Sequence, residues 1–114
     1  MVRIETNSEA GIFVISINGE IDASSSIQLD EVLKKSVAEK HPKIMVSCEQ
    51  LAYISSAGLG VFMSYIEDIN SHGIKMVIYG LNEKVKNVFE ILGLDQLLTI
   101  VETKQEASTL VNEV

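Results

Sequence analysis

The chain has 114 residues, 46% of them hydrophobic and 22% charged, a balance typical of a folded globular protein and not of a disordered or fibrous one. Nine basic against sixteen acidic side chains give a formal net charge of -7, which repels a phosphate backbone and argues against direct nucleic-acid binding. A single cysteine, no signal-peptide zones and no apolar run near the roughly 18 residues of a membrane span indicate a cytoplasmic protein without membrane contact.

The first part of the chain carries two strand patterns. Apolar and polar residues alternate over residues 2–6, and turn-forming residues separate them from a nearly continuous apolar run over residues 12–17. This order predicts a β-hairpin whose second strand is covered on both faces. Asn18 and Gly19 form a common turn dipeptide, so we expect a turn there before a short strand or sheet rim at residues 20–22.

A first helix is predicted after a run of three serines. Ser25 has Gln28 three residues later, which is the spacing of a capping box. Apolar residues then recur at one-face spacing until about Lys40, as in a helix that packs one stripe on a sheet. Residues 44–48 read as a buried strand, and Cys48 within it is expected to be an inert, buried thiol.

A second helix is predicted from about Ala57 to Gly73, because apolar side chains recur there at offsets of three and four residues. Its predicted core side chains are Leu59, Phe62, Met63, Ile66 and Ile69.

Two further strand and helix pairs complete the chain. Residues 75–79 read as a strand, and Asn82 is a predicted cap for the next helix. The predicted core face of that helix carries Val85, Val88, Phe89 and Leu92. A last strand over residues 97–101 leads to Thr103 and Glu106, a second capping-box pair at the start of a C-terminal helix.

The alternation of strands and helices behind a hairpin predicts one α/β domain over residues 1–114. Helical crossovers make the later strands parallel, and the hairpin adds an antiparallel pair. We therefore expect a mixed sheet of four to five strands with about four helices. Functional groups in such sheets tend to collect at the carboxyl ends of the parallel strands.

The stretch at the start of the second helix is the candidate site. Ser55 and Ser56 stand where a side-chain oxygen can cap the first backbone N–H groups of the helix. Gly58 and Gly60 follow, although glycine in a helix costs roughly 0.5 to 1 kcal/mol relative to alanine. We interpret the pair as bare backbone that a partner or a phosphate can approach closely.

Other chemistries fit this stretch poorly. A serine nucleophile needs a nearby base, but His41 and His72 both lie at helix ends far from the serines. The third small residue of a dinucleotide-binding loop would fall at Met63, and no phosphate-loop lysine follows. One cysteine and two dispersed histidines form no recognised metal-ligand spacing. We therefore expect neither catalysis nor a metal or other cofactor.

Three segments resemble motifs of STAS-domain anti-sigma factor antagonists. Residues 19–22 read Gly-Glu-Ile-Asp, like the Gly-Glu-hydrophobic-Asp signature of that family. Residues 53–62 resemble its Asp-Ser-Ser/Thr-Gly-Leu-Gly segment, and residues 88–94 resemble its third helix and following turn. The resemblance covers nearly the whole chain and implies the α/β STAS fold.

The resemblance also implies a partner-switching mechanism. In the family, an anti-sigma factor that is itself a serine kinase phosphorylates the first serine of the central segment, and this position corresponds to Ser56. The unmodified antagonist holds the anti-sigma factor and so frees the sigma factor, and a serine phosphatase resets the system. Two departures stand out, because well-known members carry Asp at the position of Ser55 and Ser or Thr at the position of Ala57. Ser55 is therefore the second choice of acceptor.

The predicted partner-binding residues follow from this resemblance and from the helix mouth. They are Asp22, Ser55, Ser56, Gly58, Gly60 and Ser64. For Asp22, a role as a turn residue ahead of the serines stands beside the contact role. The alternative function is a STAS scaffold, or a module that senses a nucleotide or lipid and is not switched by phosphorylation.

Overall fold

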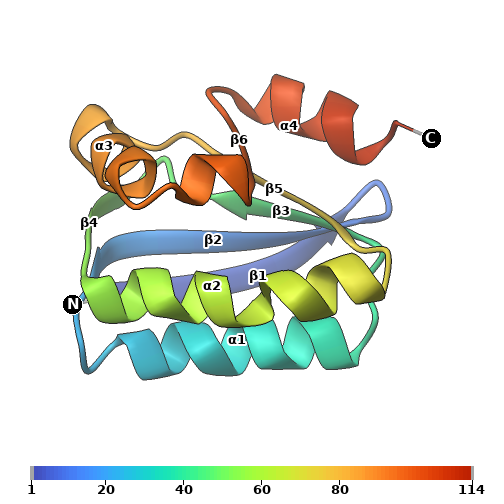
Figure 1. Cartoon of the computed structure of the whole chain (residues 1–114). Helices are drawn as coiled ribbons and strands as arrows, with labels where there is room; N and C mark the ends of the chain where they lie inside the picture. The colour runs from blue at the N-terminus through green and yellow to red at the C-terminus, as the bar shows by residue number, and fades with distance from the viewer. Residues whose placement is uncertain (1, 114) are drawn as a thin grey trace.

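A mixed six-stranded sheet is the centre of the fold in the computed structural model, which describes residues 2–113 (Figure 1). The strands are β1 (Val2–Glu9), β2 (Ile12–Ile21), β3 (Lys43–Ser47), β4 (Leu51–Ile54), β5 (Lys75–Tyr79) and β6 (Thr99–Val101). The helices are α1 (Ser26–Ala38), α2 (Ser56–Ser71), α3 (Glu83–Ile91), the short 3-10 helix η1 (Leu94–Gln96) and α4 (Lys104–Val111). The predicted α/β class with a mixed sheet is confirmed.

The strand order is β1-β2-β3-β5-β6, and β4 pairs with β2 outside this path. β1 and β2 form the predicted antiparallel hairpin, and every other pair is parallel. The short strand β4 was not expected from the sequence, which explains why the sheet has one strand more than the four to five predicted.

The expected turn at Asn18 and Gly19 is wrong, because β2 continues through both residues. Gly19 has a φ of 102°, and the register shifts between Gly19 and Glu20. β2 pairs with β3 as far as Ser16 and with β4 from Gly19 onward. The glycine therefore lets one long strand change its parallel partner instead of ending the strand.

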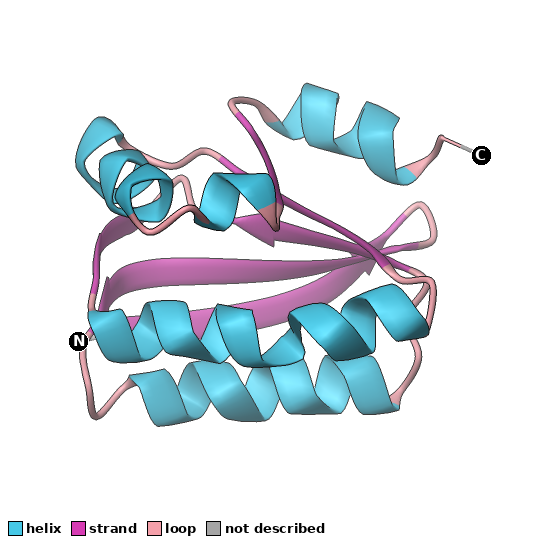
Figure 2. Ribbon diagram, in the orientation of Figure 1, coloured by secondary structure: helices cyan, strands magenta, loops and turns pink. Residues whose placement is uncertain are grey.

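The helices divide the core between the two faces of the sheet (Figure 2). α1 and α2 lie side by side on one face, where Ile15 and Ile17 of β2 share a buried cluster with side chains of α1, α2 and α3. On the opposite face α4 covers Ile12 and Val14. This alternation along β2 follows from the period of two in a strand and confirms that β2 is covered on both faces.

Three of the predicted core side chains are wrong. Met63 of α2 is 49% exposed, and on α3 and at its end Val88 is 36% and Leu92 is 53% exposed. The sheet covers a narrower stripe of each helix than the apolar positions span, so Leu59 and Phe62 are buried while Met63 lies outside the contact. Cys48 is buried as predicted, and burial raises the pKa of its thiol to about 12.

Candidate functional site

The candidate site forms where the ends of β2 and β4 meet. Ile21 and Ile54 are partners in the parallel pairing of these strands. One residue later, the backbone N–H of Ser55 donates to the carbonyl of Ile21 at 2.7 Å. This bond fixes the first turn of α2 beside the loop that carries Asp22, so two of the resembling segments lie next to each other.

Ser55 and Ser56 have different surroundings although they are adjacent. Ser55 is the N-cap of α2, it is half-buried, and its hydroxyl oxygen accepts the backbone N–H of Gly58 at 3.3 Å. Ser56 is the first residue of the helix and is exposed. Its hydroxyl makes no hydrogen bond with any other group in residues 2–113. Of the two candidate acceptors, only Ser56 therefore presents an unengaged hydroxyl to solvent.

Gly58 and Gly60 also differ, and the expectation of bare partner-facing backbone is wrong for Gly58. Gly58 is buried, and a Cβ built on it would lie 2.6 Å from Ile21 Cγ2 and 2.7 Å from Ile54 Cγ1. The close packing of α2 on the ends of β2 and β4 thus explains the missing side chain. Gly60 is exposed, and a Cβ there would meet nothing within 4 Å. Only Gly60 keeps the predicted open surface.

Asp22 organises the start of α1. Its Oδ1 accepts hydrogen bonds from the backbone N–H of Ser25 at 2.8 Å and from the hydroxyls of Ser25 and Ser24 at 2.9 Å each. These bonds, the backbone bond from Ser25 first among them, lower the pKa of the Asp22 carboxyl to about 2. Ser25 makes no side-chain cap bond to the helix, so the predicted capping box with Gln28 is wrong. The Asp22 carboxylate accepts the Ser25 N–H that Gln28 would accept in a box, and the Gln28 N–H donates to the Ser25 carbonyl instead of the Ser25 hydroxyl.

Ser64 lies on the same side of α2 as Ser56 and Gly60, because residues four apart are neighbours on a helix. It is exposed, and its hydroxyl donates to the carbonyl of Val61 at 2.7 Å. On the inner side of the helix, the Tyr65 hydroxyl donates to Asp30 Oδ1 of α1 at 2.9 Å. This bond ties α2 to α1 and leaves the side with Ser56, Gly60 and Ser64 facing away from the sheet.

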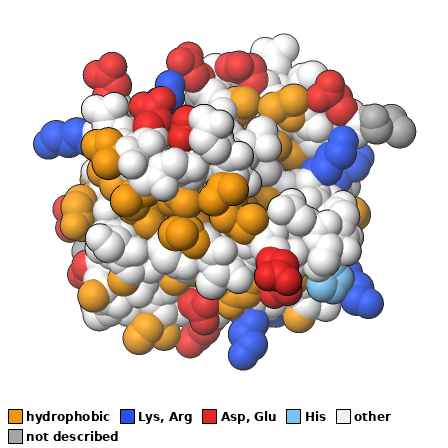
Figure 3. Space-filling model, viewed as in Figure 1, with side chains coloured by type: hydrophobic (Ala, Val, Ile, Leu, Met, Phe, Trp, Pro, Cys, Tyr) orange, Lys and Arg blue, Asp and Glu red, His pale blue; other side chains and the backbone are white. Residues whose placement is uncertain are grey.

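Exposed apolar side chains adjoin this side of α2, and the sequence pattern did not identify them. The space-filling view shows hydrophobic side chains gathered across the middle of the face that α2 and α3 share (Figure 3). The larger exposed apolar residues of this region are Met63, Val88, Ile91, Leu92 and Leu97. The sequence hinted at this exposed apolar surface in one way: the apolar stripes on α2 and α3 are wider than the part of each helix that packs on the sheet.

Neither histidine lies near the two serines. His72 is the C-cap of α2, at the other end of a 16-residue helix, and so roughly 20 Å or more from Ser56 at 1.5 Å per residue. His41 stacks on the ring of Phe13 and contacts Glu39 Oε1 at 3.0 Å. Residues 2–113 contain no cluster of three or more His, Cys, Asp or Glu side chains that could hold a metal ion. No helix in that range has the length and apolar character needed to cross a membrane.

Known proteins resemble this chain in sequence and in fold. Residues 3–107 match the family model of the STAS domain. The anti-sigma-B factor antagonist of Staphylococcus aureus (strain NCTC 8325 / PS 47) is 29% identical over 101 residues, which are 89% of this chain and 94% of that protein. Among solved structures, an anti-sigma factor antagonist from Mycobacterium paratuberculosis has a TM-score of 0.91 at 19% identity, over 99% of this chain and 96% of that one. The Bacillus cell fate determinant SpoIIAA in its phosphorylated form has a TM-score of 0.71 at 18% identity, over 98% of this chain and 100% of that one.

Proposed function

This chain belongs to the STAS domain family, and we propose that it acts as an anti-sigma factor antagonist switched by phosphorylation of Ser56. In this proposal the unmodified protein binds an anti-sigma factor that is also a serine kinase, which frees a sigma factor for transcription. Phosphorylation of Ser56 releases the partner, and a serine phosphatase restores the binding form. The protein itself has no catalytic role and works in the cytoplasm without a cofactor.

The observation that carries the proposal is the contrast between Ser55 and Ser56. The Ser55 oxygen caps α2 through the Gly58 N–H, whereas Ser56 is exposed with its hydroxyl unengaged. A kinase can therefore reach Ser56 without disturbing the cap. The relatives named as antagonists support the same role, and one fold neighbour has been solved in a phosphorylated form.

The position of Ser56 also explains how a phosphate can act without unfolding the protein. Phosphoserine carries a charge of about -1.5 to -2 at neutral pH. At the first residue of α2 this charge meets the positive end of the helix dipole and unpaired backbone N–H groups. The fold should therefore tolerate the modification, and the switch must act through the partner.

The partner is expected to cover the exposed side of α2. Ser56, Gly60 and Ser64 lie along this side, and the exposed Met63 adds apolar area beside them. A partner packed here has to remove water from the phosphate, and an uncompensated buried charge costs several kcal/mol. A cost of that size turns tight binding into weak binding, since each 1.4 kcal/mol is about tenfold in affinity.

Calorimetric titration with the anti-sigma partner from the same cell tests this proposal. Ser56→Ala should bind about as tightly as the unmodified protein, because it removes one hydroxyl from a surface made mostly of other atoms. Ser56→Glu should bind at least about tenfold more weakly, and phosphorylated Ser56 more weakly still, since it carries more charge. Equal affinities for the Ser56→Ala and phosphorylated forms would refute the switch.

Ser55→Glu is the matched control, because it places the same charge one residue earlier. Melting and circular dichroism of each form should show a folded protein, so that a loss of affinity reports on the interface. A larger effect at Ser55 than at Ser56 would identify Ser55 as the switch residue. No phosphorylation at either serine by the partner, together with tight binding, would instead favour a STAS scaffold that holds its partner constitutively.

A further inference from the structure

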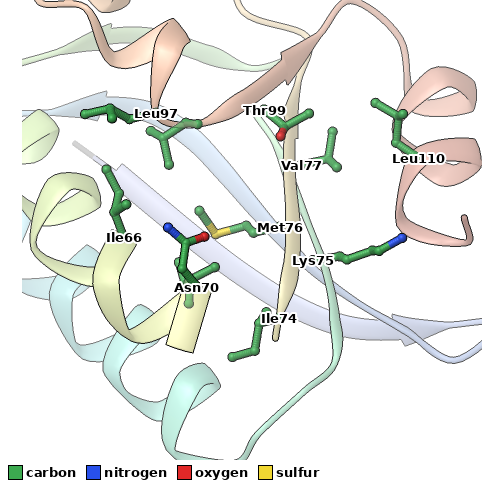
Figure 4. A pocket seen from close by; sticks show the side chains of 11 residues that line it. Ile66, Asn70, Ile74, Lys75, Met76, Val77, Leu97, Thr99 and Leu110 are labelled. Atoms are coloured by element: carbon green, nitrogen blue, oxygen red, sulfur yellow. The ribbon is translucent and has the colours of Figure 1, made fainter. Parts of the chain in front are cut away.

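We propose that the cleft between α2, η1, the edge of β5 and α4 binds a medium-chain fatty acid, with the alkyl chain inside and the carboxylate near Lys75. The cleft has a volume of about 270 Å³ and is half enclosed (Figure 4). Its position is separate from the serines, because Asn70 on its wall lies 14 residues after Ser56, roughly 21 Å along α2.

A mismatch in strand lengths creates the cleft. β3 pairs with β5 from Lys75 onward, but β6 pairs with β5 only from Val77, where Thr99 is its partner. The first two residues of β5 therefore have no neighbouring strand on the β6 side. In Figure 4 the side chains of Ile66 and Leu97 approach this open edge from one side and Leu110 from the other.

The lining of the cleft suits an aliphatic chain. Most of its eleven side chains are aliphatic, including Ile66, Ile74 and Leu97, and none of them is aromatic. A nucleotide base would lack a stacking surface there, whereas an alkyl chain gains by displacing water from the aliphatic part of the walls, which also carry the polar side chains of Asn70 and Thr99. The volume lies just below the roughly 300 to 1,000 Å³ of most small-molecule pockets, which favours a slender ligand. Leu97 is 57% exposed, so a bound chain would also cover apolar surface that now faces water.

The charge at one end of the cleft suits a carboxylate. Lys75 and Lys43 are partners in the pairing of β5 and β3, so their side chains leave the same face of the sheet. The Lys43 ammonium donates to Asn112 Oδ1, and the Lys75 ammonium donates to the carbonyl of Glu113. Both cations are thus held by uncharged oxygens at the end of α4. In a chain with a net charge of -7, this pair is a local site where an anionic head group is attracted.

Octanoate, octan-1-ol and acetate are the probes for a test on the whole chain without any partner. Isothermal titration and amide chemical shifts should show saturable binding of octanoate below about 1 mM, weaker binding of octan-1-ol, and no binding of acetate. The shifts should be largest around Asn70, Met76 and Thr99. Equal affinity for octanoate and octan-1-ol would refute the role of the lysines, and the absence of saturable octanoate binding would refute the site.

Three variants locate the site. Leu97→Asp places a charge on an exposed position of the cleft wall and should weaken octanoate binding by about tenfold or more, because it repels the carboxylate and removes an apolar contact. Leu92→Asp is the matched control, since Leu92 is 53% exposed and lies outside the cleft. Lys75→Gln should weaken octanoate binding by about threefold and leave octan-1-ol unaffected. Equal losses in Leu97→Asp and Leu92→Asp would mean that octanoate coats exposed apolar surface and has no site in the cleft.

Discussion

Alanine at Gly58 and alanine at Gly60 should change stability in opposite directions. Either substitution in a helix gains roughly 0.5 to 1 kcal/mol of helix propensity. At Gly60 nothing lies within 4 Å of the added methyl group, so we expect the full gain. At Gly58 the methyl group would sit 2.6 Å from Ile21 Cγ2 and 2.7 Å from Ile54 Cγ1. Ile21 is fully buried and Ile54 is 3% exposed, so neither can move into solvent. Overpacking of this kind costs about 1 to 3 kcal/mol.

The propensity term is common to both variants, so their difference in unfolding free energy should equal the packing cost of about 1 to 3 kcal/mol. Urea denaturation of Gly58→Ala, Gly60→Ala and the unmodified chain measures this difference directly. We expect Gly60→Ala to be the most stable of the three and Gly58→Ala the least stable. If Gly58→Ala were as stable as Gly60→Ala, then α2 would not pack on the ends of β2 and β4 as described.

Further predictions concern the core and two titrating groups. Phe62 is fully buried, so Phe62→Ala should cost about 3 to 5 kcal/mol, whereas Met63→Ala on the exposed side should stay within about 0.5 kcal/mol, as urea denaturation can measure. Burial first, and then the bond to Asp30, raise the pKa of the Tyr65 hydroxyl to about 12. Its contribution to stability is therefore present below a pH of about 10 and is lost as the pH rises through about 12. Thermal melts at alkaline pH should show this loss in the unmodified chain and not in Tyr65→Phe. The bonds from Ser25 and Ser24 lower the pKa of the Asp22 carboxyl to about 2. Its contribution to stability is therefore present above a pH of about 4 and is lost as the pH falls through about 2. Carbon-detected NMR titration should find this pKa, and Asp22→Asn should remove the loss of stability in acid.

Local signals in the sequence identified most helix starts. Asn82 caps α3 by accepting the N–H of Val85 at 2.8 Å, and Thr103 caps α4 by accepting the N–H of Glu106 at 3.1 Å. These caps depend only on residues three positions apart, so the spacing alone can predict them. Ser25 had the same spacing but failed as a cap, because its hydroxyl oxygen accepts the N–H of Asp22 and its own N–H donates to Asp22 Oδ1. A competitor outside the motif decided the outcome.

Long-range pairing set the features that the sequence could not reveal. The dipeptide of Asn18 and Gly19 is typical of a turn, yet β4 provides a second partner that keeps β2 extended through Gly19. Likewise, the apolar spacing of α2 correctly gave the buried Leu59 and Phe62, but it could not show that Met63 would face solvent. A helix pattern states which residues share a face, and the neighbours of the helix determine how much of that face is covered.

The candidate site depends on a division of roles between two adjacent serines. The sequence located both at the start of α2 but could not show which one caps the helix. A capping oxygen has to face the first N–H groups of the helix, whereas a phosphate acceptor has to face the kinase, and one hydroxyl cannot do both. Ser55 takes the first role and leaves Ser56 for the second. Because Ser55 is uncharged and the first turn of α2 contains no acidic residue, a phosphate on Ser56 would be the first negative charge placed on that turn. The first turn itself carries no charged side chain, so modification adds a charge of about -1.5 to -2 to it where a partner has to pack.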